Sequence, residues 1–337
     1  MLKFCTLFNS AYLSRGLAMY NSLLLHNEDF HLYILAFDSD CFFALSKLKL
    51  AHATIISLDE FENEDLLRVK AGRTAAEYCW TCASSSIKYC METYSLDHCS
   101  YIDADMLFFS DPKVLYKEME DAGKSVMITR HRYTPQFDQS ETSGIYCVQY
   151  MTFKNNEAGM AVLNWWVDAC LDWCYARFED GKFGDQKYLD DWTSRFNCVH
   201  ELEHLGGGVA PWNVQQYAFS RKDGQVTGRE LATGQSFDLV FYHYHAFKYA
   251  WNNTFRLTDE QYTLTRSQVK QLYKPYVYAL ATSEDQIAER ASDIASYKRS
   301  EEGVFISERL GRLLVFYLMG FYKKFYAKRF FSYGIFN

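Results

Sequence analysis

The sequence YIDADMLFFSDP, residues 101–112, contains the pattern around which the chain is organised. Asp103 and Asp105 flank one small residue, Ala104, and apolar residues precede and follow them. In a β-strand, residues i and i+2 point to the same face, so both carboxylates are expected to project together from the end of a buried strand. Buried ionised carboxylates need a cation or a hydrogen-bond network, and Mg²⁺ or Mn²⁺ suits oxygen ligands. The stretch therefore favours a metal site; the alternative is a solvated turn at the strand end.

Length and composition place the chain among globular proteins. Its 337 residues are 49% hydrophobic and 18% aromatic, enough for one large domain with an extension, or for two domains. The formal charge of −7 argues against a nucleic-acid partner. Nothing at the start of the chain marks it for secretion, so the ten cysteines are expected to be reduced thiols in the cytoplasm. Cys79 and Cys82 form a CxxC, but no second pair follows at zinc spacing, which favours buried helix cysteines over structural zinc.

Apolar runs that alternate with helical patterns indicate the fold class. Such alternation predicts βαβ units and an α/β fold with a mostly parallel central sheet flanked by helices. Ligands of such sheets gather beyond the carboxyl ends of the strands, where Asn9, Asp38 and the aspartate pair follow predicted strands. The sequence predicts strands at 2–8, 31–37, 53–58, 125–129, 145–153 and 239–251, and helices at 12–25, 73–94 and 161–178.

Three further features carry functional and structural alternatives. Arg73, Glu77 and Thr81 share a helix face, so Arg73 either forms a surface ion pair with Glu77 or reaches a phosphate or sugar. The tryptophans of 161–178 are expected in the core rather than at a ligand platform. The glycines of 206–208 allow close backbone approach to an anion or sugar, or form a flexible turn.

The predicted strand 239–251 carries two histidines. His243 and His245 would share one strand face, and either could complete a metal site with the aspartates.

Residues 256–337 change in character and predict a helical extension. In 303–337 there are six basic residues, one acidic residue and eleven Phe or Tyr. The longest uncharged run, Leu313 to Tyr322, is ten residues, while a bilayer span needs about 20. Basic and aromatic composition favours a helix on an anionic membrane surface; the alternative is a helix packed on the main domain or on the partner of a homodimer.

Five motifs together resemble the GT-A fold nucleotide-sugar glycosyltransferases, most closely the family 8-like retaining enzymes, over roughly residues 1–255. Asp103-Ala104-Asp105 matches the DxD metal motif, and Thr142-Ser143-Gly144 is similar to the Asn-Ser-Gly strand start. Asp185-Gln186 and Pro211-Trp212-Asn213 resemble two further motifs. Residues 243–251 resemble the His-x-x-Gly-x-x-Lys-Pro-Trp signature, but Ala246 replaces Gly, Lys248 comes one residue early and Pro is missing. The register therefore leaves His245 as the alternative ligand to His243.

The resemblance implies roles for individual residues. Asp103, Asp105 and His243 (or His245) would bind Mn²⁺ or Mg²⁺; Asp185 would hold sugar hydroxyls, and Gln186 would lie beside the anomeric carbon. The implied nucleotide- and diphosphate-binding residues are Asn9, Tyr12, Asp38, Arg73, Ala104 and Lys248. The implied sugar- and acceptor-binding residues are Thr142, Ser143, Gly144, Gly206, Gly207, Trp212 and Asn213.

These observations lead to one main functional hypothesis. It is a cytoplasmic, metal-dependent glycosyltransferase on the inner membrane surface, with residues 1–255 as the catalytic domain. It would transfer a sugar, with retention, from a nucleoside diphosphate donor, by resemblance UDP, to a glycan or lipid-linked acceptor. The alternatives are a non-catalytic nucleotide- or carbohydrate-binding relative and a metal-dependent phosphate-ester hydrolase.

Overall fold

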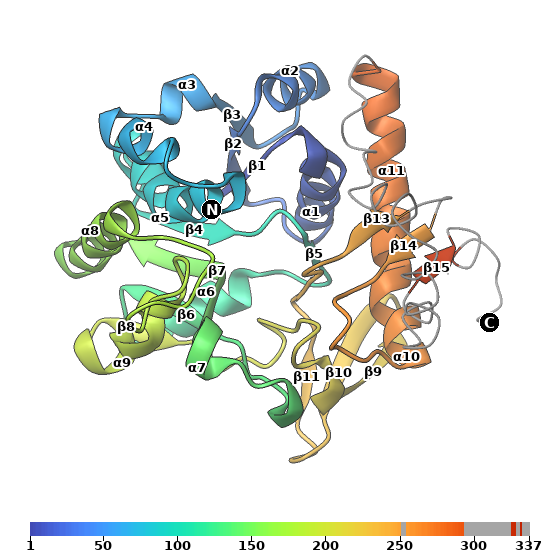
Figure 1. The fold of residues 1–337 in the computed structure, drawn as a ribbon. Helices are drawn as coiled ribbons and strands as arrows, with labels where there is room; N and C mark the ends of the chain where they lie inside the picture. The colour runs from blue at the N-terminus through green and yellow to red at the C-terminus, as the bar shows by residue number, and fades with distance from the viewer. Residues whose placement is uncertain (251–253, 293–324, 328–330, 332–337) are drawn as a thin grey trace, which may run out of the picture.

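A seven-stranded sheet forms the centre of the protein (Figure 1). The computed structural model describes residues 1–250, 254–292, 325–327 and 331. The strand order is β3-β2-β1-β4-β7-β6-β8, and only β7 runs antiparallel to its neighbours. This arrangement confirms the predicted α/β class with a mostly parallel sheet. Its strands are β1 (Leu2–Phe8), β2 (Phe30–Ala36), β3 (Ala53–Ser57), β4 (His98–Ile102), β6 (Val126–Arg130), β7 (Tyr146–Lys154) and β8 (Val199–Glu201).

Helices cover both faces of this sheet, because its central strands are apolar on both sides. In β1, Phe4 and Phe8 pack into one core with α1 and α2, whereas Cys5 and Leu7 pack into the other core with α5 and α8. The α-helices before residue 200 are α1 (Leu13–His26), α2 (Ser39–Leu48), α3 (Leu58–Phe61), α4 (Glu64–Lys70), α5 (Ala75–Thr93), α6 (Lys113–Asp121), α7 (Ser140–Ser143), α8 (Glu157–Asp172) and α9 (Trp192–Arg195).

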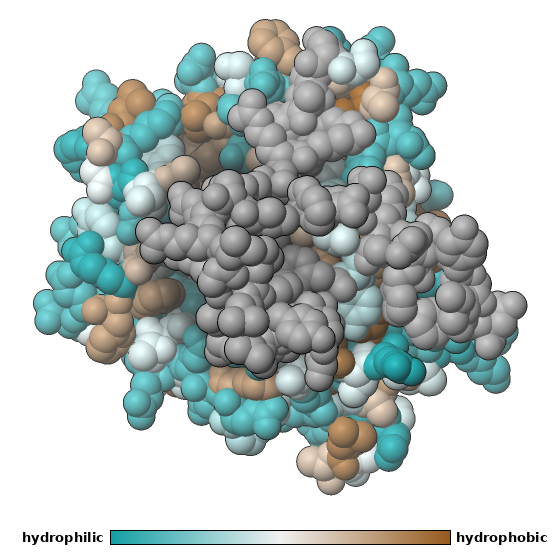
Figure 2. Space-filling view, turned by 45° about the vertical axis from the view of Figure 1, so that its right-hand side comes forward, coloured by the Kyte–Doolittle hydropathy of each residue, from teal (hydrophilic) through white to brown (hydrophobic). Residues whose placement is uncertain are grey.

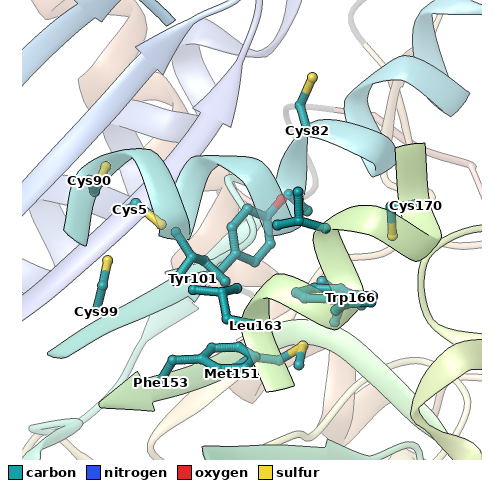
Figure 3. Packing of buried hydrophobic residues seen from close by; sticks show 14 of the residues in the cluster. Cys5, Cys82, Cys90, Cys99, Tyr101, Met151, Phe153, Leu163, Trp166 and Cys170 are labelled. Atoms are coloured by element: carbon teal, nitrogen blue, oxygen red, sulfur yellow. The ribbon is translucent and has the colours of Figure 1, made fainter. Parts of the chain in front are cut away.

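The core under α5 and α8 is rich in sulfur and aromatic rings (Figure 3). Phe153 stacks on Trp166, with ring centroids 6.1 Å apart, and Trp166 and Trp173 are buried as expected. Figure 3 shows Cys5, Cys90 and Cys99 close together where β1, α5 and β4 meet. All ten cysteines are free, and eight of them are buried.

Residues after 200 form a second group of elements beside the central sheet (Figure 1). A two-stranded ribbon, β5–β12, joins this group to the turn after β4. The remaining helices are α10 (Arg266–Gln268), a π-helical turn (Val269–Tyr273) and α11 (Lys274–Arg290), which packs on α1. The remaining strands are β5 (Met106–Phe108), β9 (Tyr217–Lys222), β10 (Gln225–Glu230), β11 (Ser236–Asp238), β12 (Phe241–His243), β13 (Lys248–Ala250), β14 (Thr254–Arg256) and β15 (Phe325–Ala327).

Two predicted elements have different bounds in the structure. Helix α8 ends at Asp172, because Trp173 adopts extended backbone angles, whereas the sequence predicted a helix to residue 178. The predicted strand 239–251 is wrong as a single element: it divides into β12 and β13. Between them Phe247 N donates to Tyr244 O at 2.9 Å, and Ala246 has a left-handed φ of 60°.

Most of the predicted membrane-surface segment, 303–337, lies outside the described residues. Its described residues are β15 and Phe331, and β15 pairs antiparallel with β14. The predicted domain boundary at 255/256 falls inside β14, and the division into two domains stays a prediction. Among the described residues, no helix is long and apolar enough to cross a bilayer. The face in Figure 2 is largely hydrophilic where it is described, with hydrophobic residues in small groups.

Candidate functional site

Asp103 and Asp105 lie on the turn between β4, which ends at Ile102, and β5, so the expectation that they share a strand face at i and i+2 is wrong. The turn is held at both sides: Asp103 N donates to Gln149 O of β7 at 3.0 Å, and Tyr244 N donates to Asp105 O at 2.8 Å. Tyr101 on β4 donates its hydroxyl to Asp103 Oδ1 at 3.0 Å. Both carboxylates are thereby fixed at the carboxyl edge of the sheet.

His243 at the end of β12 faces the two carboxylates. Its Nε2 lies 3.1 Å from Asp105 Oδ1 and 3.7 Å from Asp103 Oδ2. The candidate ligand atoms of these three residues all lie within 4.8 Å of one another, and the described residues contain no other such group. The side chains are 29% (Asp103), 15% (Asp105) and 6% (His243) exposed. The structure thus brings together the three residues of the predicted metal site.

The three groups strongly influence each other's protonation. Burial raises the pKa of Asp103 to about 6, against the attraction of His243. Burial also acts to raise the pKa of Asp105, but His243 outweighs it and lowers that pKa to about 2. Burial would lower the pKa of His243, yet Asp105 outweighs burial and raises it well above its usual value. The cluster therefore concentrates negative charge that a cation can neutralise.

Gln149 on β7 determines how the His243 ring is oriented. Its Oε1 lies 2.7 Å from His243 Nδ1, and an amide oxygen can only accept, so Nδ1 carries the proton in this pair. Nε2 is then the nitrogen that faces the aspartates. Metal-binding histidines commonly use their other ring nitrogen in this way.

The donor set fits a hard divalent ion. Two carboxylates and one imidazole converge, and carboxylate-rich sites suit Mg²⁺ and Mn²⁺. Gln149 Nε2 is buried without a hydrogen-bond partner among the described residues, so the amide is held there through Oε1 alone. We therefore name Asp103, Asp105 and His243 as the residues that would hold the ion.

His245, the alternative ligand, lies in the turn after β12. Its Nε2 is 3.7 Å from Asp259 Oδ2, and its ring packs edge-on against Trp212. The ligand group contains His243 and not His245. The expected shared strand face is wrong, because the strand ends at His243.

Asp185 and Gln186 meet the segment 142–144 next to this cluster. Gln186 Nε2 donates to Ser143 O at 2.6 Å, and Trp166 Nε1 donates to Asp185 O at 3.0 Å. Gly144 has a φ of 106° and could not carry a side chain easily, because a Cβ there would lie 3.2 Å from Asp190 Oδ1. Burial raises the pKa of Asp185 to about 8, and the charge of Asp103 adds to the shift.

Other predicted nucleotide-pocket residues lie at the same edge of the sheet. Asn9 follows β1, and Asp38 follows the adjacent strand β2. Asp38 accepts hydrogen bonds from Ser10 N, Ser10 Oγ and Cys41 N, at 2.9, 2.8 and 2.7 Å, so it joins the ends of the two strands. The ring of Tyr12 stacks on Arg15, whose guanidinium carbon is 4.3 Å from the ring centroid.

Arg73, Ala104 and Lys248 have different surroundings. Arg73 donates to Thr81 and to Leu171 O, while Glu77 forms a capping box with Thr74 at the start of α5. The structure therefore has these contacts in place of the surface ion pair between Arg73 and Glu77, which was one of the two interpretations of the sequence. Ala104 is buried between the two aspartates, and Lys248 begins β13.

Trp212 and Asn213 shape the segment that backs the histidines. The Trp212 ring is edge-on to His243, with centroids 5.4 Å apart, and its Nε1 donates to His131 O at 2.9 Å. Asn213 is buried and donates to His131 O and Gly208 O, each at 2.8 Å. Asn213 therefore fixes the 208–213 loop from inside.

Gly206 and Gly207 are buried in packing contacts of the protein itself. A Cβ on Gly206 would lie 1.9 Å from Asp238 O, and one on Gly207 would lie 2.6 Å from a methyl of Leu202. The glycines therefore allow the backbone to pack closely against other segments of the protein.

Sequence reasoning missed Gln149, Tyr101 and Arg15. Gln149 had a signal, since it is one polar amide in an otherwise largely apolar strand, and buried amides need partners. Arg15 is buried on α1 and donates to Phe247 O at 3.2 Å, which ties α1 to the turn that carries His245. Nothing in its local sequence pattern pointed to that turn.

Comparison with solved structures gives low sequence identities. The chain is similar to the glycosyltransferase GlyE of Streptococcus pneumoniae TIGR4, at 13% identity and a TM-score of 0.49, covering 87% of this chain and 64% of that one. It is also similar to an active-site mutant of LgtC, at 12% identity and a TM-score of 0.45, covering 72% and 87%. For mouse xyloside xylosyltransferase 1 the identity is 13%, the TM-score 0.44, and the coverage 72% and 97%.

Comparison with curated sequences identifies two relatives in Bacillus subtilis (strain 168), whereas no family model matches the chain. Uncharacterized protein YfnD is 28% identical over 296 residues, 87% of this chain and 93% of that protein. Uncharacterized protein YfnF is 30% identical over 279 residues, 80% of this chain and 90% of that protein. The chain therefore belongs to the same protein family as YfnF.

Proposed function

We propose that this protein is a metal-dependent glycosyltransferase that moves a sugar from a nucleoside diphosphate donor, a UDP-sugar, to a glycan or lipid-linked acceptor. The observation that carries the proposal is the convergence of Asp103, Asp105 and His243 at the carboxyl edge of the sheet, with the buried Asp185 close by. Ligands of open α/β sheets bind at that edge. A divalent ion held by the three residues would neutralise the charge that develops on the leaving diphosphate.

The chain's own residues have complementary tasks in this proposal. Asp185, with a pKa of about 8, keeps its proton at neutral pH, so its carboxyl group can both donate to and accept from sugar hydroxyls. Gln186 is anchored through Nε2 on Ser143 O, which leaves its Oε1 for the reacting sugar. Asn9, Tyr12 and Arg73 would line the nucleotide pocket, and Lys248 would contact the diphosphate as a point charge.

The same proposal includes retention of configuration and UDP as the nucleotide, which the motif resemblance supports. It also includes a location at the membrane surface, which the composition of 303–337 supports. Ser143 would support the sugar pocket through the hydrogen bond that its carbonyl accepts from Gln186, with Thr142 and Gly144 on either side of it. Trp212 would form part of the acceptor side, because its ring lies against His243 and His245.

The test is release of nucleoside diphosphate from UDP-glucose, UDP-galactose, UDP-N-acetylglucosamine and GDP-mannose, each with Mn²⁺ or Mg²⁺. We expect turnover of at least one donor, and Asp103→Asn should reduce it ~10²-fold or more by weakening charge stabilisation. Asp121→Asn, on the exposed end of α6, is the matched control and should keep full activity. Release of nucleoside monophosphate and sugar 1-phosphate, in place of nucleoside diphosphate, would support the hydrolase alternative, and absence of turnover with every donor would reject the proposal.

A further inference from the structure

A second candidate binding site lies at the edge of the small sheet β11-β10-β9. A cavity of about 470 Å³ is lined by the edge strand β9, by residues 263–268 and by Gln136. Cavities that bury drug-sized ligands have volumes of ~300–1,000 Å³. We propose that this cavity binds a neutral oligosaccharide stretch of the acceptor, beyond the sugar that reacts. This inference rests on the proposed function and names the part of the substrate that the cavity recognises.

The lining of the cavity is polar but uncharged. None of its lining residues is Asp, Glu, Lys, Arg or His, and its polar members are Gln136, Gln215, Thr263, Thr265, Ser267 and Gln268. A phosphate, a nucleotide or an acidic peptide needs cationic partners, which this lining does not provide. A neutral sugar offers hydroxyl groups that amides and hydroxyls can both donate to and accept from. The lining therefore favours an uncharged carbohydrate.

The other lining residues are apolar or aromatic. Leu231, which is 55% exposed, provides most of its open apolar surface, while Tyr217 and Phe219 of β9 line it with only 4% and 8% of their surface exposed. Sugar rings present C–H faces as well as hydroxyl edges, and apolar and aromatic side chains pack against such faces. The combination of apolar and neutral polar groups matches both surfaces of a sugar ring.

The polar groups divide into a fixed set and an available set. Gln215 is fixed, because its Nε2 donates to Pro211 O and Thr263 O at 2.9 and 2.8 Å, and its Oε1 accepts from Thr134 at 3.0 Å. By contrast, the side chains of Gln136 and Ser267 make no hydrogen bond to the described part of the chain. Their donors and acceptors are available to a ligand without loss of a protein contact.

The cavity shares a segment with the predicted metal site. Gln215 is three residues after Trp212, whose ring contacts His243 with centroids 5.4 Å apart. Gln136, which also lines the cavity, is two residues after Thr134, whose N donates to Trp212 O at 2.9 Å. An oligosaccharide seated in the cavity would therefore lie beside the segment that backs the reacting centre.

The test compares three neutral tetrasaccharides, cellotetraose, maltotetraose and N-acetylated chitotetraose, by saturation-transfer NMR with the full-length protein. Ala218→Trp places a large ring in the cavity from an exposed position of β9. Ser220→Trp is the matched control, because residue 220 is on the same exposed strand face but does not line the cavity. We expect at least one tetrasaccharide to bind the wild type and Ser220→Trp, and to bind Ala218→Trp at least tenfold more weakly. Gln136→Ala should weaken the same binding severalfold.

Donor turnover is measured in parallel and separates the two proposals. Release of nucleoside diphosphate without acceptor should be equal in the wild type, Ala218→Trp and Ser220→Trp. If no tetrasaccharide binds the wild type, or if Ala218→Trp binds as well as the control, the inference is overturned while the proposed function stands. If a tetrasaccharide binds but no donor is turned over, the proposed function fails, and the role of the cavity as an acceptor subsite fails with it.

Discussion

Gln149 sets which nitrogen of His243 faces the two aspartates. The amide accepts from Nδ1 at 2.7 Å and is buried in β7, while the backbone carbonyl of the same residue accepts from Asp103 N. One residue thus touches two of the three predicted metal ligands. Such outer contacts commonly change metal affinity 10- to 100-fold.

We therefore expect Gln149→Leu to weaken Mn²⁺ binding ~10- to 100-fold, because the ring loses the acceptor that orients it. Stability should also fall, by ~1–3 kcal/mol, because the buried Nδ1–H of His243 is left without its acceptor. Gln149→Glu keeps an acceptor oxygen at the same distance and should retain binding within a fewfold. Calorimetric titration with Mn²⁺ measures the affinity, and equal affinity in Gln149→Leu and wild type would contradict the orienting role.

Asp185 makes stability depend on pH in the absence of ligands. Its pKa is about 8 in the folded protein, because it is buried, and 3.8 is its ordinary value. Between these values the unfolded chain releases the proton while the folded protein keeps it, so raising the pH favours unfolding. The stabilising effect is complete below pH ~3.8 and is lost as the pH rises through 8.

Asp185→Asn removes this titration. We expect its free energy of unfolding, relative to the wild type, to increase by ~1.4 kcal/mol per pH unit between pH 5 and 7. Urea unfolding at several pH values without metal measures the difference. Asp191→Asn, at an exposed position, is the control and should give a difference that does not vary with pH. A flat difference for Asp185→Asn as well would show that Asp185 is ionised in the folded protein.

At the scale of elements, the strands of the central sheet other than β8 could be predicted, because apolar runs of this length are typical of buried strands. β1, β2 and β3 begin and end within a residue of the predicted bounds. The position of the aspartate turn at the sheet edge followed from the same pattern. The predicted parallel sheet then placed Asn9 and Asp38 at that edge, where the structure has them.

Other features of the site depend on contacts between distant elements. The choice between His243 and His245 depends on the turn at Ala246, which has a left-handed backbone conformation. Alanine rarely adopts this conformation, so the sequence does not predict the turn. Gly206 could not be assigned from sequence, because the atom that its missing side chain accommodates is the carbonyl of Asp238, in a different element. Arg73 likewise donates a hydrogen bond to Leu171 O, which lies at the end of α8 and nearly one hundred residues away in the sequence.

At the scale of the whole molecule, the chain end returns to the region that carries the site. β15 pairs with β14, which pairs with β13, the strand that begins at Lys248. Phe331 is 2% exposed, packs against Phe255 with ring centroids 6.1 Å apart, and accepts a hydrogen bond from Tyr278 at its carbonyl. Part of the predicted membrane-surface segment is therefore in contact with the protein core.

Phe331→Ala should therefore lower the free energy of unfolding by ~3 kcal/mol, as for other buried Phe-to-Ala changes that leave a cavity. Phe178→Ala, at a 53% exposed position, is the control and should change it by less than ~0.5 kcal/mol. Urea unfolding of the full-length proteins gives both values. Because the β13–β14 hairpin carries Lys248, we also expect the apparent KM for the nucleotide-sugar donor to rise in Phe331→Ala. Equal stability of the two variants would show that the chain end does not hold this hairpin, and would leave the segment available for the membrane surface.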